Sequence, residues 1–331
     1  MYTNIYTFPE IIGTLAYLGV TFKPGGHLNP EEPIQRHIRK ALASMNMLSS
    51  VSVNPSGFSK LLCTRLYAHI VRPQLEYDLD INRFMASQLH TLEEAQKNCI
   101  KKIYGARGKM STKFMLYIYK LPLMSERVNA LLACPLPHIR NTNGSQWYTL
   151  SRTPLWKTLL STTEEPDTCS LKAAKRRFLQ QNLEIRQRCR TSKLLSNCCR
   201  SISLDPILRL PTSKSECSRC IRWRLGWLAG GKPRLCPKHP TQLLSKKHAV
   251  SCLDMHRRLF MPDTICDPLS SLLNMLPLYP SVSPNLALAW SQRWPTICSL
   301  LYELNQLYRN KFISTKHPHG QKLLVWLNQF F

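Results

Sequence analysis

The sequence lacks any apolar run of about 18 residues, the length that a membrane-spanning helix needs, so we predict no such helix. Its first residues also lack the basic stretch, apolar stretch and small-residue cleavage site of a secretory signal. We therefore expect an intracellular protein of the nucleus or cytoplasm, kept in a reducing compartment. In such a compartment its 13 cysteines are metal ligands or buried side chains more often than disulfide partners.

Acidic residues are scarce. The chain has 19 Asp and Glu against 45 Lys and Arg, a formal net charge of +26. Residues 170–260 hold 21 of the bases and 4 of the acids, so most of the excess lies in about a quarter of the chain. This density favours a polyanionic partner, RNA or DNA ahead of an acidic membrane surface.

Paired carboxylates are also missing. Catalysis by two metal ions needs at least two carboxylates that clamp the ions together. Among the seven aspartates only Asp78 and Asp80 are close neighbours, and we interpret them as part of a turn or helix cap rather than as a strand-borne pair. There is no nucleophile elbow and no Gly-rich phosphate loop, and Gly230-Gly231 is typical of a turn. We expect no catalytic residue and no small-molecule substrate.

The first 139 residues predict a β-hairpin followed by a helical domain. An alternating apolar run at 11–20 and the turn residues at 23–26 indicate a hairpin within 1–30. Within 31–139, helices are predicted from the N-cap Asn29 to Met45, from Ser56 to Val71 before Pro73, and from Phe84 to Tyr104, with a cap at Gly105. Their predicted buried stripes are Ile34, Ile38, Leu42 and Met45, then Phe58, Leu62, Leu66 and Ile70, then Leu89, Leu92, Gln96, Cys99 and Ile103. We also expect an ion pair between Glu93 and Lys97 and shorter apolar or helical segments at 114–119 and 124–134.

The rest of the chain predicts a linker and two further regions. Residues 140–169 are rich in Asn, Ser, Thr and Pro and are typical of a linker. Residues 170–260 begin with a basic helix at 171–190, expected to turn Phe178 and Ile185 inward. Residues 261–331 form a nearly neutral Leu-rich helical region, whose Leu stripes are expected to pack in a core: Leu269, Leu272, Leu273 and Leu276, then Ile297, Leu300, Leu301, Leu304 and Leu307. The predicted fold class is mainly α, with a helical bundle, a small metal-binding module and a helical C-terminal region.

One stretch has the spacing of a metal site. Cys236-x-x-His239 can bind a metal from one tight turn, and His248-x-x-x-Cys252 projects two ligands from one face of a helix. Two sulfurs and two nitrogens suit tetrahedral zinc. A competing set uses Cys217-x-x-Cys220 with Cys236 and either His239 or Cys252. A third reading has no metal, only buried thiols and surface imidazoles.

Cationic and aromatic side chains alternate around this stretch, a combination that binds nucleic acid through phosphates and stacked bases. These residues are Arg222, Trp223, Arg224, Trp227, Lys232 and Arg234. Further phosphate contacts are predicted on helices, from Arg36, Arg39, Lys40, Lys175 and Arg176. Two plainer alternatives stay open, namely that Trp223 and Trp227 pack a helix against a core and that the basic helix faces are only solvated.

Four short pieces of the N-terminal region resemble the reverse transcriptases of non-LTR retrotransposons, just after their catalytic palm. They are Tyr17-Leu18-Gly19-Val20, Leu66-Tyr67 leading to Val71-Arg72-Pro73-Gln74-Leu75-Glu76-Tyr77, Leu89-x-x-Leu92-Glu93-x-x-Gln96, and Ile103-Tyr104-Gly105. The resemblance covers about 15–135 and implies a primer-grip-like hairpin followed by a thumb. The family also carries a C-terminal Cys/His zinc segment after a basic R-x-x-x-G-like stretch, to which Arg222-x-Arg224-Leu225-Gly226 and the metal motif are similar. His239 departs from the family, which more often has cysteine there.

The resemblance implies a thumb and zinc-binding portion of an RNA-directed DNA polymerase without its palm. The Mg²⁺ of polymerisation would belong to the missing palm, and this chain would grip template–primer or target strand without activity of its own. Its partners would be RNA or DNA, together with the rest of the polymerase or a protein bound through the C-terminal helices. Two alternatives remain, a non-enzymatic zinc scaffold that binds proteins independently of salt and a decayed retroelement reading frame.

Overall fold

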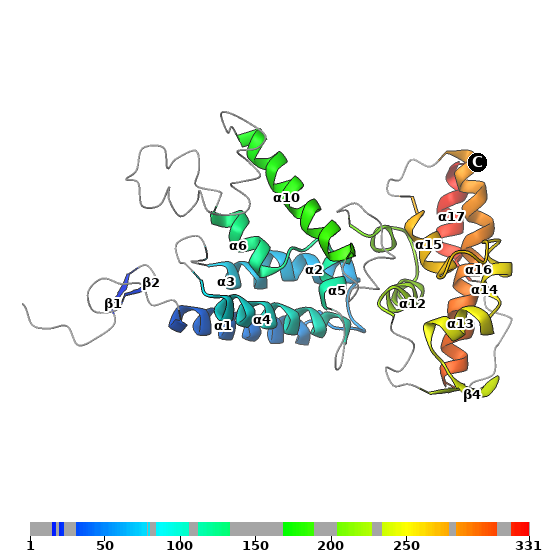
Figure 1. The fold of residues 1–331 in the computed structure, drawn as a ribbon, viewed down its shortest axis with the longest axis horizontal. Helices are drawn as coiled ribbons and strands as arrows, with labels where there is room; N and C mark the ends of the chain where they lie inside the picture. The colour runs from blue at the N-terminus through cyan, green and yellow to red at the C-terminus, as the bar shows by residue number, and fades with distance from the viewer. Residues whose placement is uncertain are drawn as a thin grey trace, which may run out of the picture. The chain divides into compact units, whose positions relative to one another are not determined.

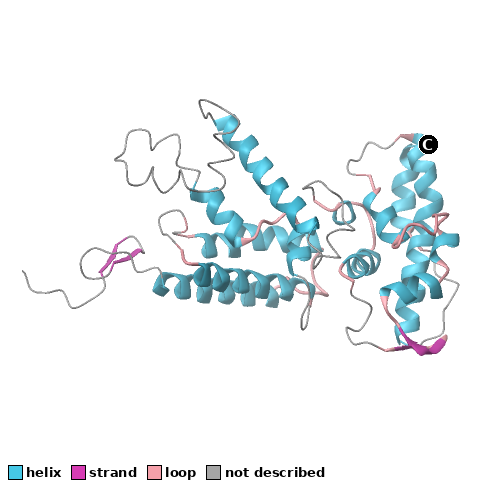
Figure 2. Ribbon diagram, viewed as in Figure 1, coloured by secondary structure: helices cyan, strands magenta, loops and turns pink. Residues whose placement is uncertain are grey.

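Helices dominate the described part of the chain (Figure 2), which confirms that the protein is mainly α-helical. The structure, a computed structural model, describes residues 15–17, 20–22, 31–77, 79, 84–105, 112–132, 168–188, 204–226, 234–277, 283–309 and 319–330. None of the described helices combines the length and hydropathy that crossing a bilayer requires. The chain divides into two compact bodies, Met1–Phe58, Leu62–Gly105 and Pro122–Phe178 in one, and Ser59–Leu61, Ala106–Leu121 and Leu179–Phe331 in the other.

The predicted N-terminal hairpin is present. Strands β1 (Leu15–Tyr17) and β2 (Val20–Phe22) pair in antiparallel fashion, with Leu15 opposite Phe22 and Tyr17 opposite Val20. Two residues of the sequence separate the strands, so the chain reverses earlier than predicted. The turn expected at 23–26 and the N-cap Asn29 lie outside the described residues.

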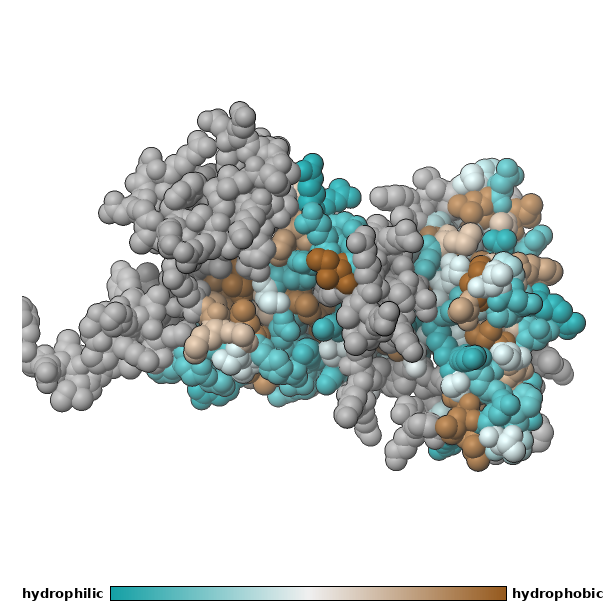
Figure 3. Space-filling view, viewed as in Figure 1, coloured by the Kyte–Doolittle hydropathy of each residue, from teal (hydrophilic) through white to brown (hydrophobic). Residues whose placement is uncertain are grey.

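The first body is a helical bundle built on α1 (Glu31–Ser50) and α4 (Ala86–Tyr104) (Figure 1). Gln88 donates to Glu31 over 3.4 Å at one end and Lys102 contacts Asn46 towards the other, so the two helices run in the same direction. The segment between them returns antiparallel, with Gln74 hydrogen-bonded to Ser44. Hydrophilic residues cover the visible side of α1 (Figure 3), because its apolar positions face the bundle. Those buried positions include Ile34, Ile38, Ala41 and Met45.

The predicted second helix is continuous but differs in register and end. It comprises α2 (Lys60–Leu66), a π-helical turn η1 (Tyr67–Val71) and α3 (Arg72–Glu76), so it passes Pro73 instead of ending before it. The π turn lets Arg72 donate to the carbonyl of Tyr67, five residues back, just ahead of the proline that cannot donate. The predicted stripe was wrong, since Phe58, Leu62 and Ile70 are exposed. The buried stripe is Cys63, Tyr67, Val71 and Leu75.

Helix α4 confirms its predicted cap. Gly105 has φ of 64° and donates its N–H to the carbonyls of Lys101 and Lys102. The expected Glu93–Lys97 ion pair is absent from this described helix. Lys97 pairs instead with Glu94 over 2.6 Å, and Glu93 accepts from Ser125 over 2.8 Å. Ser125 belongs to α6 (Met124–Leu132), which this bond fixes against α4.

Helix α10 (Thr168–Arg188) corresponds to the basic helix predicted at 171–190, and its bounds differ from the predicted ones by two or three residues. Phe178 and Leu183 are buried, whereas Ile185, predicted to face inward, is exposed. The helix therefore turns a somewhat different face inward than its sequence pattern indicated.

The second body gathers short helices around the long helix α16 (Pro284–Arg309). Its other elements are α5 (Thr112–Ile118), η2 (Pro206–Leu208), α12 (Lys214–Arg224), β3 (Leu235–Cys236), β4 (His239–Leu243), α13 (Lys246–Cys252), α14 (Met255–Arg258), α15 (Pro268–Asn274), α17 (Gln321–Leu327) and η3 (Asn328–Phe330). The predicted Leu stripes of the C-terminal region are buried, as are Trp290 and Trp294. Arg258 binds Glu303 of α16 through two contacts of 2.8 and 2.5 Å, which ties α14 to this core.

A capping interaction joins the start of α12 to the start of α17. Ser213 caps α12 by accepting from the N–H of Glu216, whose carboxylate accepts in return from the Ser213 N–H over 2.9 Å. The other Glu216 oxygen accepts from the N–H of Gly320 over 2.7 Å. Gly320 has φ of 77°, and a Cβ there would lie 2.5 Å from Cδ1 of Trp294.

We predict that Gly320→Ala lowers the free energy of unfolding by at least about 2 kcal/mol, because the methyl group meets Trp294 and the backbone conformation disfavours a side chain. Urea denaturation measures the effect. Lys322→Ala, at an exposed position on the same helix, is the control and should change stability by less than about 0.5 kcal/mol. Equal stability of both variants would contradict the close packing of Gly320.

Candidate metal centre and its basic surroundings

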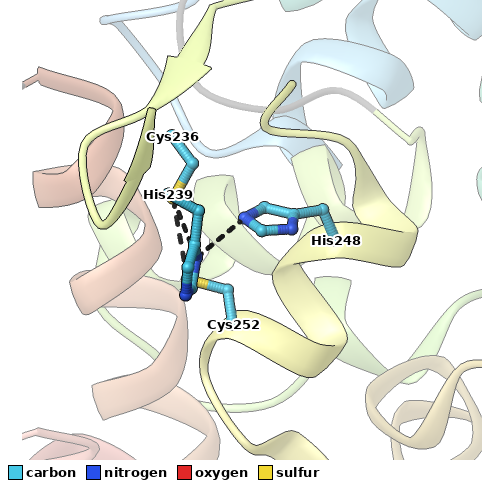
Figure 4. Close-up of side chains that lie close together, drawn as sticks. All are labelled: Cys236, His239, His248 and Cys252. Atoms are coloured by element: carbon cyan, nitrogen blue, oxygen red, sulfur yellow. Dashed lines mark hydrogen bonds between the residues drawn. The ribbon is translucent and has the colours of Figure 1, made fainter. Parts of the chain in front are cut away.

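A tight hairpin presents the first two predicted ligands. Strands β3 and β4 pair in antiparallel fashion, with Cys236 opposite His239 and only Pro237 and Lys238 between them. Both side chains project from the closed end of the hairpin toward α13 (Figure 4). Cys236 is buried and His239 is exposed, so the site sits at the surface with one sulfur beneath it.

Helix α13 presents the other two ligands. Ser245 caps it by accepting from the N–H of His248 over 3.1 Å. His248 and Cys252, four residues apart, share the face that points at the hairpin (Figure 4). The local sequence thus builds each half of the site independently, one from a turn and one from a helix face.

The four side chains converge, with their ligand atoms all within 4.8 Å of one another, and three of the distances between them are close to those of a tetrahedral site. Cys236 Sγ lies 3.8 Å from His239 Nδ1 and 3.7 Å from Cys252 Sγ, and His239 Nδ1 lies 3.3 Å from His248 Nε2. Bonds of about 2.3 Å to sulfur and about 2.05 Å to nitrogen, arranged tetrahedrally, imply about 3.8 Å between sulfurs, about 3.5 Å between sulfur and nitrogen and about 3.3 Å between nitrogens. The two sulfurs are far beyond the ~2.05 Å of a disulfide. The predicted set is therefore confirmed as a group that can hold a metal ion.

Without a metal ion, the surroundings favour the protonated thiol of Cys252 and the neutral imidazole of His248. Burial, together with the nearby Cys236 thiol, raises the pKa of Cys252 to about 11. Burial and the neighbouring His239 lower the pKa of His248. A bound divalent cation reverses the first effect by stabilising thiolates, and it binds the neutral imidazoles that the second effect supplies. The donor set thus fits a metal chemically as well as geometrically.

The competing ligand set is not assembled. Cys217 and Cys220 lie on α12, and neither belongs to the metal-competent group found among the described residues. The Cys217 thiol points to the carbonyl of Ile207 at 3.6 Å, and burial raises its pKa to about 12. Cys220 is fully buried, and its pKa is raised by the same cause. The structure therefore favours a packing role for these two thiols.

Two residues predicted to contact nucleic acid belong to the core instead. Trp223 is 1% exposed, its indole N–H donates to Asp267 over 3.1 Å, and the Lys246 ammonium lies 4.8 Å from the indole centroid. Arg224 is 4% exposed and is held by Asp205 at 3.1 Å and Asn274 at 2.7 Å. Neither side chain can reach a ligand outside the protein, so the prediction that Trp223 and Arg224 contact nucleic acid was wrong.

The other predicted contact residues have different fates. Arg39, Lys40, Arg176 and Arg234 are exposed, and Arg36 and Arg222 are half-buried. Lys175 lies on α10, where the structure does not describe its side chain, and Trp227 and Lys232 lie outside the described residues. The sequence interpretation missed Arg219 and Arg309, which the structure brings near Arg222. Of these two arginines, only Arg219 could have been recognised from the sequence, because it lies three residues before Arg222 on the same helix.

Comparison with protein-family models, with curated proteins and with solved structures gives no match for this chain. The geometry of the four ligands and the charge around them are therefore the observations on which a function can be argued.

We predict that Trp223→Phe lowers the free energy of unfolding by about 1–3 kcal/mol, because it leaves Asp267 without its indole donor and removes buried volume. Nucleic-acid affinity should be unchanged. Chemical denaturation and fluorescence anisotropy measure the two quantities. Weaker binding at unchanged stability would restore the predicted stacking role of this residue.

Proposed function

We propose that this chain is a non-catalytic nucleic-acid-binding protein with a structural zinc site, derived from the thumb and C-terminal zinc region of a non-LTR retrotransposon reverse transcriptase. The observation that carries the proposal is the convergence of two cysteines and two histidines in a strongly basic body. The retroelement parentage is supported by the sequence resemblance, and the helical bundle at 31–132 is compatible with a thumb.

Zinc is the ion that this donor set favours. Two thiolates exclude the hard cations Mg²⁺ and Ca²⁺, and a tetrahedral arrangement of two sulfurs and two nitrogens is a common zinc geometry. Four protein ligands leave no position for water or substrate, so the ion would be structural rather than catalytic. Its role would be to hold a two-residue strand, β3, against a seven-residue helix, α13, which are too short to be stable alone.

We predict one zinc per chain in protein purified under reducing conditions, measured by elemental analysis. Cys236→Ala and His248→Ala should each reduce zinc well below one equivalent, because three ligands bind far more weakly than four. Cys266→Ser alters an exposed cysteine outside the group and serves as the matched control that retains full zinc. Metal-free protein, or zinc retained in both ligand variants, would remove the proposed site.

Nucleic acid is the partner that the charge favours. The described residues between 204 and 330 carry 14 Lys and Arg against 6 Asp and Glu, an excess of 8. Each of those six carboxylates already contacts a cation, a histidine or a backbone N–H within the protein: Asp205, Glu216, Asp254, Asp263, Asp267 and Glu303. An external polyanion is therefore the natural complement of the remaining positive charge.

We predict that the full chain binds single-stranded RNA or DNA with an affinity that falls steeply as salt rises. Each phosphate contact contributes a slope of about −0.7 to the plot of log affinity against log salt concentration. Fluorescence anisotropy with labelled oligonucleotides between 0.05 and 0.5 M salt measures the slope. A flat plot would argue against phosphate contacts, and salt-independent binding of a protein would favour the scaffold alternative.

A further inference from the structure

Helices α12 and α16 bring arginines together where they pack. The Arg219 guanidinium of α12 lies 5.4 Å from the ring centroid of Tyr302 on α16. Figure 1 shows α12 nearly end-on beside α16, so the two helices cross steeply. Arg222 and Arg309, each in the last turn of its helix, interact electrostatically.

The proximity of these side chains has an electrostatic cost. Burial, then Arg309 and then Arg219, lower the pKa of the Arg222 guanidinium. A fourth cation, Arg234, lies over the ring of Tyr308 at 5.1 Å, next to Arg309 in sequence. We call Arg219, Arg222, Arg234 and Arg309 the arginine cluster.

The nearest carboxylates of the pair are engaged by other groups. The two oxygens of Glu216 accept from the N–H groups of Ser213 and Gly320. Both oxygens of Glu303 are bound by Arg258, and one of them also accepts from Ser299. Both carboxylates thus accept hydrogen bonds from groups outside the arginine cluster, and Glu216 also interacts electrostatically with Arg219.

Helix capping alone does not account for four cations. The C-terminal end of a helix carries about −0.5 elementary charge, so two such ends supply about −1. Four guanidinium groups supply +4, and the Glu216 carboxylate, which interacts electrostatically with Arg219, supplies −1, so about two positive charges remain. Like charges this close raise the free energy of the fold, a cost that an anionic ligand would remove.

Tyrosine rings contact the guanidinium faces of Arg219 and Arg234, whereas Arg222 donates to the Ser218 hydroxyl over 3.1 Å. A guanidinium stacked on a tyrosine uses its face, while its N–H groups point outward around its edge. These groups match the oxygens of a phosphodiester in a bidentate contact. Arg234 and Arg309 are exposed, and Arg219 and Arg222 are half-buried, so the cluster can be reached from outside the body that carries it.

We propose that the arginine cluster is the surface on which this protein binds the phosphate backbone of a nucleic acid. The proposal rests on the proposed nucleic-acid-binding function and locates it where Arg219 and Arg222 of α12 come near Arg309 of α16. The metal-binding hairpin contributes Arg234, two residues before the ligand Cys236, so the metal would also fix one edge of this surface.

The test is the triple variant Arg219→Gln, Arg222→Gln, Arg309→Gln in the full chain. Loss of three contacts should reduce the salt slope for single strands by about 2 and weaken binding about 100-fold at 0.1 M salt, with little effect at 1 M. Arg234 is left unchanged because its substitution could disturb the metal ligands. Zinc content and circular dichroism establish that the variant is folded.

Two matched triple variants distinguish the effect of where the arginines lie from the effect of net charge alone. Lys214→Gln, Arg293→Gln, Lys322→Gln removes the same charge elsewhere in the same body and should reduce the slope by less than half as much. Arg219→Lys, Arg222→Lys, Arg309→Lys keeps the charge and should retain a slope close to that of the unsubstituted chain. If the glutamine triple does not fold, Arg309→Gln alone, at the exposed end of α16, should reduce the slope by about 0.7.

The outcomes distinguish this inference from the proposed function. If the unsubstituted chain binds oligonucleotides and the glutamine variants keep its slope, the inference is wrong and the proposed function stands. Equal losses in the cluster and control triples would also overturn it, since net charge would then suffice. If the unsubstituted chain binds no oligonucleotide, the proposed function fails. Binding of phosphatidylserine vesicles, but not oligonucleotides, through the cluster would assign the surface to a membrane.

Discussion

The convergence of Cys236, His239, His248 and Cys252 is the constraint that relates the β3–β4 hairpin to α13. A two-residue strand and a seven-residue helix bury little surface and cannot hold each other in place. Four donor atoms within 4.8 Å of one another give these pieces a common centre. Helix α14 follows directly and binds α16 through Arg258 and Glu303, so the position of the metal module is transmitted to the core.

The positive charge of this region occurs in two different settings. Arg224 and Lys246 are paired with carboxylates, Arg224 with Asp205, and Lys246 with Asp267 beside the buried indole of Trp223. Arg222 and Arg309 instead lie near one another. Composition alone cannot separate these settings, since a buried ion pair and an exposed phosphate contact employ the same residue types.

Local sequence patterns predicted the positions of the helices well. They predicted less well which face of each helix is buried. The cap at Gly105 and the apolar periodicity of α1 and α16 were predicted because each depends on neighbours within a turn or two. The second helix was misjudged because two adjacent apolar stripes share the same spacing, and the bundle buries the one through Cys63 and Tyr67 rather than the one through Leu62. The partner of Lys97 was misjudged because Ser125, distant in sequence, engages Glu93.

The sequence by itself determined the four residues that can hold a metal ion, because each pair is set by a spacing that one turn or one helical repeat converts directly into proximity. It also determined the mainly helical class and the basic character. Tertiary structure alone decided that Cys217 and Cys220 are excluded from the site, that Trp223 and Arg224 are buried, and that Arg219, Arg222 and Arg309 come together. These outcomes depend on how α12 packs on α16, about 80 residues away in the chain, and that packing leaves no local pattern.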